Sequence, residues 1–323
     1  MKISDLAYYR TGGYSAYFFA PESLEELVDA VSFCARAVVP AQFLGAGSNS
    51  LVSDQYFPGA TISLHKMSQI TRASEGLLCQ AGALNTQISQ RALEEELSGA
   101  AWMHGLPGSI GATARMNARC YGGEISHLVV GVTLISEAGH VSRVRFATEA
   151  ERKAAFKGYK DTLWMRTRDL IAEVELALPD DQDVQQTRVL MERCLADRQA
   201  KHQFDFPSCG CVFKNDYRPA VSVSSGLLLD LAGAKSLDEA KVGVSPYHAN
   251  FLFNKNRASS RDILEMTFAM REKVWAEFGV WLAYEMEFLG FMPHDLGAQF
   301  YEQRPENLRH DRLQEARAVF QQK

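Results

Sequence analysis

Residues 44–54 read Leu-Gly-Ala-Gly-Ser-Asn-Ser-Leu-Val-Ser-Asp and follow an apolar segment at residues 38–44. The apolar segment is typical of a β-strand, and the glycines end it in a turn. Small residues at such a turn allow backbone N–H groups to surround a phosphate, because no side chain is in the way. On this stretch alone, a phosphate-binding loop and an ordinary tight turn are equally open.

The stretch differs from the dinucleotide-binding fingerprint of a Rossmann fold. Ser50 stands where that fingerprint has its third glycine. About twenty residues further on, where an acid would bind a ribose, the chain has Leu64, His65 and Lys66. A Rossmann domain is therefore not indicated.

A second run of small residues, Gly-Leu-Pro-Gly-Ser-Ile-Gly at residues 105–111, favours phosphate binding over an ordinary turn. It predicts another flexible loop with few side chains, and residues 121–124 add Tyr-Gly-Gly-Glu. Two separate glycine loops suit a long ligand that contains a diphosphate.

Length and composition set the class of protein. The chain has 323 residues, which suggests two or three domains, and its 46% hydrophobic and 23% charged residues are typical of a globular protein. A net charge of −5 argues against a general nucleic-acid binder. The start of the chain and its short apolar runs predict neither a secretory signal nor a membrane span, and we expect a cytoplasmic protein. The spacing of the six cysteines predicts no zinc site, and we expect no metal.

The hydrophobic periodicity predicts a mixed α+β fold. We expect helices at residues 23–36, 86–97, 184–198, 259–278 and 305–320, and strands at residues 38–44, 59–64, 77–81, 129–136 and 170–178. In the last helix, Leu308, Leu313, Ala316 and Phe320 suit packing on the body of the protein or on a second subunit, and both remain open.

Seven motifs, in order and spacing, resemble the UDP-N-acetylenolpyruvoylglucosamine reductase (MurB) family. They lie at residues 10–13, 44–54, 105–111, 116–124, 207–215, 248–254 and 280–290. The resemblance implies a three-domain FAD-binding fold of the vanillyl-alcohol oxidase or PCMH type with a C-terminal substrate domain. The implied boundaries are residues 1–72 and 73–196 for the two FAD-binding subdomains, 197–290 for the substrate domain and 291–323 for a helical extension.

The resemblance also implies the reaction and its cofactors. NADPH reduces FAD, and a hydride then passes to UDP-N-acetylglucosamine enolpyruvate to give UDP-N-acetylmuramate for peptidoglycan synthesis. The implied FAD contacts are Gly45, Ala46, Gly47, Ser48, Asn49, Ser50, Gly105, Pro107, Gly108, Ser109, Gly111, Asn117, Tyr121 and Gly122. The implied contacts to the UDP-sugar are Asn215, Lys201, Tyr159 and His248.

Cys211 stands in Gly-Cys-Val-Phe-Lys-Asn, where the family has a proton-donating Ser. An ordinary thiol, with a pKa of about 8.5, is mostly protonated at pH 7 and can donate a proton. A small buried Cys and a Cys-x-Cys redox pair with Cys209 are the alternatives. In an extended segment the two thiols would point to opposite faces, which argues against a disulfide between them.

Glu285 and Lys160 are the other two implied catalytic residues. Glu285 matches the family Glu that stabilises the enol intermediate, although a strand with alternating exposed Glu residues fits the pattern equally well. Lys160 replaces the family Arg that contacts the substrate carboxylate, and it keeps the charge but loses the bidentate fork. A solvated loop lysine is the alternative.

Further departures from the family leave other functions open. Arg119 and Cys120 occupy positions where the family usually has Gly and Ala, and Tyr284 replaces a Pro. Arg119 could contact a diphosphate or indicate an altered substrate. The alternatives are a paralogous flavin oxidoreductase with another substrate and a catalytically silent binding protein. The oligomeric state cannot be predicted.

Overall fold

A computed structural model describes residues 1–237, 239–301, 304–305 and 307–321. The chain forms two compact units, each assembled from separate stretches of sequence. Unit 1 contains residues 1–14, 47–57 and 201–323, and unit 2 contains residues 15–46 and 58–200. The finer boundaries at residues 72, 196 and 290 stay a prediction.

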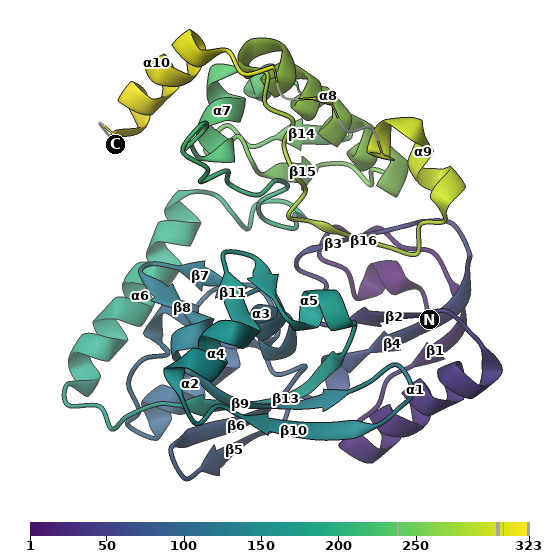
Figure 1. Ribbon diagram of the computed structural model, residues 1–323, viewed down its shortest axis with the longest axis vertical. Helices are drawn as coiled ribbons and strands as arrows, with labels where there is room; N and C mark the ends of the chain where they lie inside the picture. The colour runs from purple at the N-terminus through teal and green to yellow at the C-terminus, as the bar shows by residue number, and fades with distance from the viewer. Residues whose placement is uncertain (238, 302–303, 306, 322–323) are drawn as a thin grey trace. The chain divides into compact units, whose positions relative to one another are not determined.

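The first sheet of unit 2 has the strand order β1-β4-β2 (Figure 1). Its strands are β1 (Ser15–Phe19), β4 (Phe57–Ser63) and β2 (Ala41–Leu44), and β2 runs parallel to β4. Helix α1 (Leu24–Ala37) begins at Ser23, whose side chain accepts a hydrogen bond from the Glu26 N–H. This confirms the predicted first helix. The strand expected from residue 38 begins only at Ala41, because Val38 ends the helix with φ = 54°.

The second sheet of unit 2 is antiparallel and has the order β10-β9-β13-β6-β5. Its central strand carries Val174, which lies opposite Cys79 on one side and Val132 on the other. All three side chains are buried, so alternate positions of β13 form the core. The strands are β5 (Ile70–Ala73), β6 (Gly76–Gln80), β9 (Val129–Ile135), β10 (Val141–Arg145) and β13 (Leu170–Ala177).

Helices and short hairpins complete unit 2. The helices are α2 (Asn85–Glu94), α3 (Ile110–Arg115), α4 (Glu149–Ala155), α5 (Trp164–Thr167) and α6 (Val184–Ala200). One hairpin pairs β7 (Arg119–Cys120) with β8 (Gly123–Glu124), and another pairs β11 (Phe156–Gly158) with β12 (Asp161–Thr162). The prediction of a loop over residues 105–111 is wrong at its end, because Ile110 and Gly111 form the start of α3.

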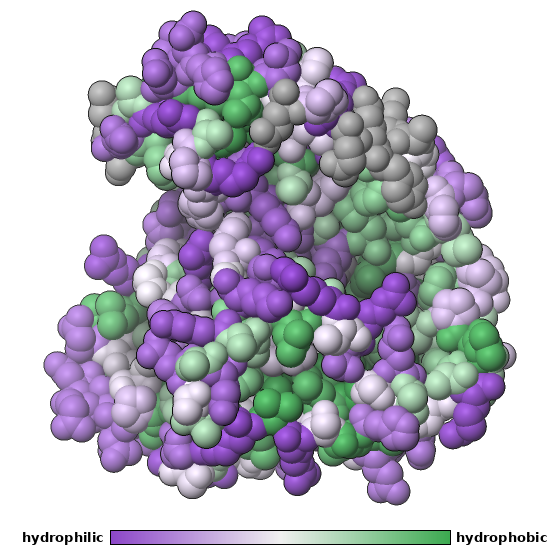
Figure 2. Space-filling model, in the orientation of Figure 1, coloured by the Kyte–Doolittle hydropathy of each residue, from purple (hydrophilic) through white to green (hydrophobic). Residues whose placement is uncertain are grey.

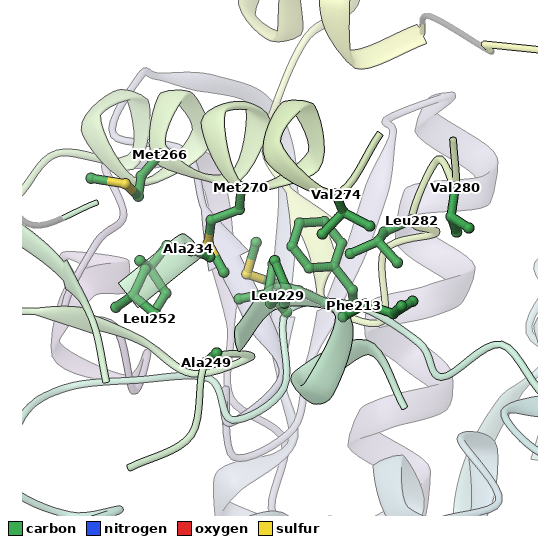
Figure 3. Packing of buried hydrophobic residues seen from close by; sticks show 14 of the residues in the cluster. Phe213, Leu229, Ala234, Ala249, Leu252, Met266, Met270, Val274, Val280 and Leu282 are labelled. Carbon is green, nitrogen blue, oxygen red and sulfur yellow. The ribbon is translucent and has the colours of Figure 1, made fainter. Parts of the chain in front are cut away.

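The core of unit 1 is built on α8 (Ser260–Phe278), whose capping box joins Ser259 and Asp262. Its buried face carries the apolar residues that helical spacing predicts, Ile263, Met266, Met270, Val274 and Phe278. They belong to the same buried cluster as Phe213, and Figure 3 shows Met270 and Val274 on the side of the helix that faces it. The other elements are α7 (Ser225–Leu231), the antiparallel pair β14 (Val242–Val244) and β15 (Leu252–Asn254), and the parallel pair β3 (Ser50–Val52) and β16 (Glu287–Leu289).

The C-terminal residues pack on unit 1. They form α9 (Pro293–Tyr301) and α10 (His310–Gln321), so the predicted helix begins at residue 310 instead of 305, and residue 306 lies outside the described residues. Leu313 and Ala316 are fully buried in the unit 1 core. Leu313 and Ala316 therefore pack on the body of the protein.

Short 3-10 helices connect these elements: η1 (Ile3–Asp5), η2 (Leu64–Lys66), η3 (Ala101–Met103), η4 (Ile125–His127) and η5 (Ala234–Ser236). On the face drawn in Figure 2, hydrophilic residues are spread among the hydrophobic ones. No helix in the described ranges is long and apolar enough to cross a membrane.

Candidate active site

The segment that carries Cys211 is held on one side by Asn250. The Val212 N–H donates to the Asn250 carbonyl at 2.9 Å, and the Phe213 N–H donates to Asn250 Oδ1 at 3.0 Å. Asn250 Nδ2 donates back to the Phe213 carbonyl at 2.8 Å. Because Asn250 is only 1% exposed, these hydrogen bonds are shielded from water and fix the backbone on both sides of Val212.

The other side of the same segment contacts the chain around Glu285. The N–H groups of Glu285 and Met286 both donate to the Val212 carbonyl, at 2.8 and 3.2 Å. Asn49 Nδ2 donates to the Glu285 carbonyl at 3.0 Å, and Asn49 in turn accepts the Glu287 N–H. Unit 1 therefore brings Asn49, Cys211 and Glu285 into neighbouring positions. Cys211 and Glu285 are half-buried, so both keep partial access to solvent.

Cys209 has a different environment from Cys211. Its thiol is 3% exposed and donates to the Ser50 carbonyl at 3.0 Å. Burial raises the pKa of Cys209 well above the usual thiol value, so this thiol stays neutral. None of the six cysteines forms a disulfide, and Cys209 links the segment of Cys211 to the first glycine run.

Three predicted substrate residues lie around the start of α7. Asn215 Oδ1 accepts the Ser225 N–H at 3.0 Å. The His248 ring lies beside Gly226, where a Cβ would come within 3.0 Å of its Cε1 atom. Burial, followed by the charges of Lys201 and Lys235, lowers the pKa of His248. A neutral His248 with Lys201 and Asn215 nearby is a suitable environment for an anionic ligand.

In unit 2, the two glycine runs approach each other at Gly45 and Ser109. A Cβ placed on Gly45 would lie 2.5 Å from Ser109 Oγ, so a larger residue here would force the Ser109 side chain to move. Ser109 is 1% exposed, and its Oγ has no hydrogen-bond partner among the described residues. The Asn85 N–H donates to the Gly108 carbonyl, and the Gly111 N–H donates to the Ala81 carbonyl, both at 3.0 Å. These hydrogen bonds hold the second glycine run in a fixed conformation.

Asn117 joins the two small hairpins of unit 2. Its Nδ2 donates to Glu124 Oε1 at 2.8 Å and to the Gly158 carbonyl at 3.0 Å. Its Oδ1 is buried and has no partner in the part of the chain that the structure describes. Burial alone would raise the pKa of Glu124, but hydrogen bonds from Ser126 and Asn117 lower it overall. Glu124 is thus a carboxylate that helps to hold the predicted cofactor residue Asn117.

The turn of the first hairpin contacts α6. Tyr121 Oη hydrogen-bonds to Asp197 at 2.8 Å, and the guanidinium of Arg198 lies 5.1 Å from the centre of the Tyr121 ring. Arg198 Nη2 also lies 3.4 Å from Cys120 Sγ. Tyr121 was predicted from the sequence as a site residue, but Arg198 was not. The only sign of its role is that this arginine occupies a position of the α6 helix where the pattern has apolar residues.

Lys160 and Tyr159 lie on the second hairpin. The ammonium of Lys160 is 5.9 Å from the centre of the Tyr159 ring, and the guanidinium of Arg119 is 4.4 Å from the same centre. The backbone of Lys160 has φ = 52°, which is unusual for a residue other than glycine. The three predicted catalytic residues are therefore divided between the units, with Cys211 and Glu285 in unit 1 and Lys160 in unit 2.

A separate pocket of about 860 Å³ in unit 1 contains none of the predicted site residues. It is lined by Lys2, Arg10, Asp54, Phe206, Pro207, Asn254, Lys255, Asn256, Arg257, Ala258 and Ser259. Among the described residues, no three His, Cys, Asp or Glu side chains are grouped in a way that could hold a metal ion.

Comparison with known proteins identifies the family. Residues 15–145 match an FAD binding domain, and residues 201–289 match the C-terminal domain of UDP-N-acetylenolpyruvoylglucosamine reductase. The reductase of Geobacillus thermodenitrificans is 32% identical over 281 residues, which cover 87% of this chain and 89% of that protein. The chain belongs to the UDP-N-acetylenolpyruvoylglucosamine reductase family.

Other members of the reductase family agree over a similar span. The reductase of Listeria innocua is 30% identical over 89% of this chain and 93% of its own length. The crystal structure of UDP-N-acetylenolpyruvylglucosamine reductase (MurB) from Thermus caldophilus has a TM-score of 0.71 and 26% identity, and covers 90% of this chain and 97% of its own. The C-terminal reductase domain lies entirely within unit 1, whereas most of the FAD binding domain lies in unit 2.

Proposed function

We propose that this protein is an FAD-dependent reductase that uses NADPH to convert UDP-N-acetylglucosamine enolpyruvate to UDP-N-acetylmuramate. The observation that carries the proposal is the pairing of the Cys211 segment with the Glu285 segment through the Val212 carbonyl. This pairing places a protic side chain and a carboxylate, both half-buried, on adjoining backbone. A reaction that must protonate a carbanion-like centre needs a proton donor there, and a carboxylate beside it can accept a hydrogen bond from the enol form of the intermediate.

The residues of the glycine runs fit FAD. Ser109 Oγ and Asn117 Oδ1 are buried polar atoms without partners among the described residues, and such atoms usually indicate a missing ligand or water. We assign FAD contacts in unit 2 to Gly45, Ala46, Gly105, Pro107, Gly108, Ser109, Gly111, Asn117, Tyr121 and Gly122, and further contacts to Gly47, Ser48, Asn49 and Ser50. When bound, FAD would accept a hydride from NADPH and deliver it to the enolpyruvyl double bond.

The residues of this chain would control what happens to the substrate. After the hydride has added to the terminal carbon, the electron pair of the double bond lies on the carbon that carries the carboxylate. Lys160 would stabilise that negative charge by its positive charge, and Glu285 would accept a hydrogen bond from the enol form of the intermediate. Cys211 Sγ would donate a proton to the same carbon, which forms the new C–H bond and leaves a thiolate that regains its proton from solvent.

The UDP part of the substrate would bind next to α7. We assign Lys201 and Asn215 to the diphosphate, with Tyr159 and His248 as further substrate contacts. The low pKa of His248 keeps that ring neutral near pH 7, so it would donate or accept a hydrogen bond without adding charge. Both NADPH and UDP-sugars are cytoplasmic metabolites, so we place the protein in the cytoplasm.

The test is an anaerobic absorption experiment on the purified protein loaded with FAD. NADPH should bleach the flavin band, and the enolpyruvyl sugar should restore it promptly. UDP-N-acetylglucosamine, which lacks the double bond, is the matched control and should leave the flavin reduced. A flavin that stays reduced with both sugars would indicate another oxidant, and a protein that takes up no FAD would overturn the proposal.

A further inference from the structure

The position of Arg119 is fixed by the first hairpin of unit 2. Arg119 pairs with Glu124 across β7 and β8, and the two residues of the turn, Tyr121 and Gly122, have φ values of 49° and 79°. Positive φ at both positions is typical of the tight turns that set strand register. Arg119 Nη1 therefore lies 3.9 Å from Glu124 Oε2, and Glu124 is itself held by Asn117 and Ser126.

The guanidinium of Arg119 is also held by an aromatic ring from the second hairpin. Its centre lies 4.4 Å from the middle of the Tyr159 ring, which is within the range of a cation–π contact. The Lys160 ammonium approaches the same ring at 5.9 Å. Asn117 ties the two hairpins together through Glu124 and the Gly158 carbonyl, so both cations are held at one place in unit 2.

This arrangement concentrates positive charge. Lys160 acts electrostatically on Cys120, the neighbour of Arg119, and Arg198 lies 3.4 Å from the Cys120 sulfur. Three cations, Arg119, Lys160 and Arg198, thus lie at or beside this hairpin, together with the acids Glu124, Asp197 and, next to Lys160, Asp161. Arg119 and Lys160 approach the same Tyr159 ring, so an anionic ligand there would be attracted by both cations.

We propose that Arg119 binds the carboxylate of the enolpyruvyl group, with Lys160 beside it as a second cation. This inference rests on the proposed function, because it needs a substrate with that carboxylate. A guanidinium offers two parallel N–H donors that match the two carboxylate oxygens, whereas the Lys160 ammonium offers a single charged centre. Arg119 therefore orients the carboxylate and stabilises the negative charge that develops next to it.

The experiment compares FAD-loaded wild-type protein with Arg119→Ala, Arg119→Lys and Lys160→Arg/Arg119→Gly variants. Arg119→Ala should lower kcat/KM for the enolpyruvyl sugar by about 10- to 100-fold, the range for losing a charge-assisted hydrogen-bonded pair. Arg119→Lys should recover only part of this loss, and the double variant, which moves the guanidinium to position 160, should recover most of it. Arg168→Ala removes an exposed arginine of unit 2 and is the matched control, with unchanged kinetics.

A binding measurement separates this role from a structural one. Arg119→Ala should weaken binding of the enolpyruvyl sugar and leave the affinity for UDP-N-acetylglucosamine, which has no carboxylate, unchanged. Equal weakening of both would assign Arg119 to the diphosphate, and unchanged kinetics in a variant that retains FAD would assign it to hairpin structure alone. Either result overturns the inference while wild-type turnover upholds the proposed function. Absence of wild-type turnover overturns both.

Discussion

The Glu285 N–H donates to the carbonyl oxygen of Val212 at 2.8 Å, and this hydrogen bond joins two segments that lie far apart in the sequence. Cys211 directly precedes Val212, so the proposed proton donor and the proposed carboxylate are positioned by the same short piece of backbone. The arrangement depends little on the length of either side chain. A change of side chain at Cys211 should therefore alter chemistry more than structure.

We expect Cys211→Ala to lower turnover of the enolpyruvyl sugar by about 10²- to 10⁴-fold, the usual contribution of a positioned general acid. Cys211→Ser should keep much of the activity, because a hydroxyl also donates a proton. Stopped-flow absorbance of flavin reoxidation measures both. Reduction of the flavin by NADPH is the internal control and should be unchanged. Equal activity of the Ala and Ser variants would remove Cys211 from the mechanism.

Gly45→Ala should destabilise unit 2 and weaken FAD binding, because the new Cβ would lie 2.5 Å from Ser109 Oγ. Adding Ser109→Ala removes that oxygen and leaves neighbours at 3.7 and 3.8 Å, which are ordinary contacts. The double variant should therefore regain thermal stability, while FAD affinity stays low if Ser109 Oγ contacts the cofactor. Thermal melts and FAD titration give the two readouts. A double variant as unstable as Gly45→Ala would mean that the contact with Ser109 is not the cause.

Asn250→Ala should lower the free energy of unfolding by about 2–4 kcal/mol, because the buried N–H and carbonyl of Phe213 would lose their partners. It should also lower kcat, since the Cys211 segment would lose its support. Asn256→Ala, at an exposed position, is the matched control and should be neutral. Urea denaturation and steady-state kinetics test the two effects. A stable but inactive Asn250→Ala protein would assign Asn250 to the chemistry instead.

Two glycines with nearly the same backbone conformation allow the cost of backbone strain to be distinguished from the cost of a steric clash. Gly279 has φ = 69°, and a Cβ there would lie 1.6 Å from the Asn307 carbonyl oxygen. Gly233 has φ = 71° and nothing within 4 Å of its Cβ position. Gly233→Ala should cost about 1–2 kcal/mol of stability from the backbone alone. Gly279→Ala should in addition release the segment that leads to α10, which limited proteolysis would detect. Equal cleavage of both variants would contradict this expectation.

The stability of unit 1 should fall when the pH drops below about 6.5, the usual pKa of His. Burial lowers the pKa of His248, so the unfolded chain binds a proton more readily than the folded one. The folded state is therefore most stable above the pKa that His248 has in the unfolded chain. It loses this stability as the pH falls toward the lower pKa that His248 has in the folded state. His248→Gln should reduce the slope of the urea midpoint between pH 7.5 and 5.5. An unchanged slope would contradict the role of His248, because His65 and His104, whose pKa values burial also lowers, lie in unit 2.

Local signals in the sequence predicted most elements of the fold. The first helix and α8 were placed correctly because Ser23 and Ser259 are strong caps followed by apolar residues at helical spacing. Gly108 and Gly111 were read as a loop, but the hydrogen bonds of Ile110 and Gly111 to Ala83 and Ala81 turn the second half into α3. These contacts join distant segments, and no local pattern reports them.

The candidate site was predictable as a set of residues but not as an arrangement. Cys211 and Glu285 were identified from their motifs, yet the role of Asn250 in fixing the Cys211 segment depends on long-range contacts. Arg119 was visible only as a departure from the family pattern. Its contact with Tyr159 comes from two hairpins joined by Asn117, and neither hairpin alone predicts it.

The order of synthesis bears on the assembly of unit 1. Asn49 and Glu285, which share a hydrogen bond, are 236 positions apart in the sequence. The strands β3 and β16, which pair with each other, have a similar sequence separation. At about 5–20 residues per second, the ribosome needs roughly 10–50 seconds to make that stretch. Residues 15–46 of unit 2 precede this interval and residues 58–200 are made within it, so unit 2 is complete while β3 still has no strand to pair with. Unit 2 can therefore fold during translation, and unit 1 must wait until the last part of the chain has been released.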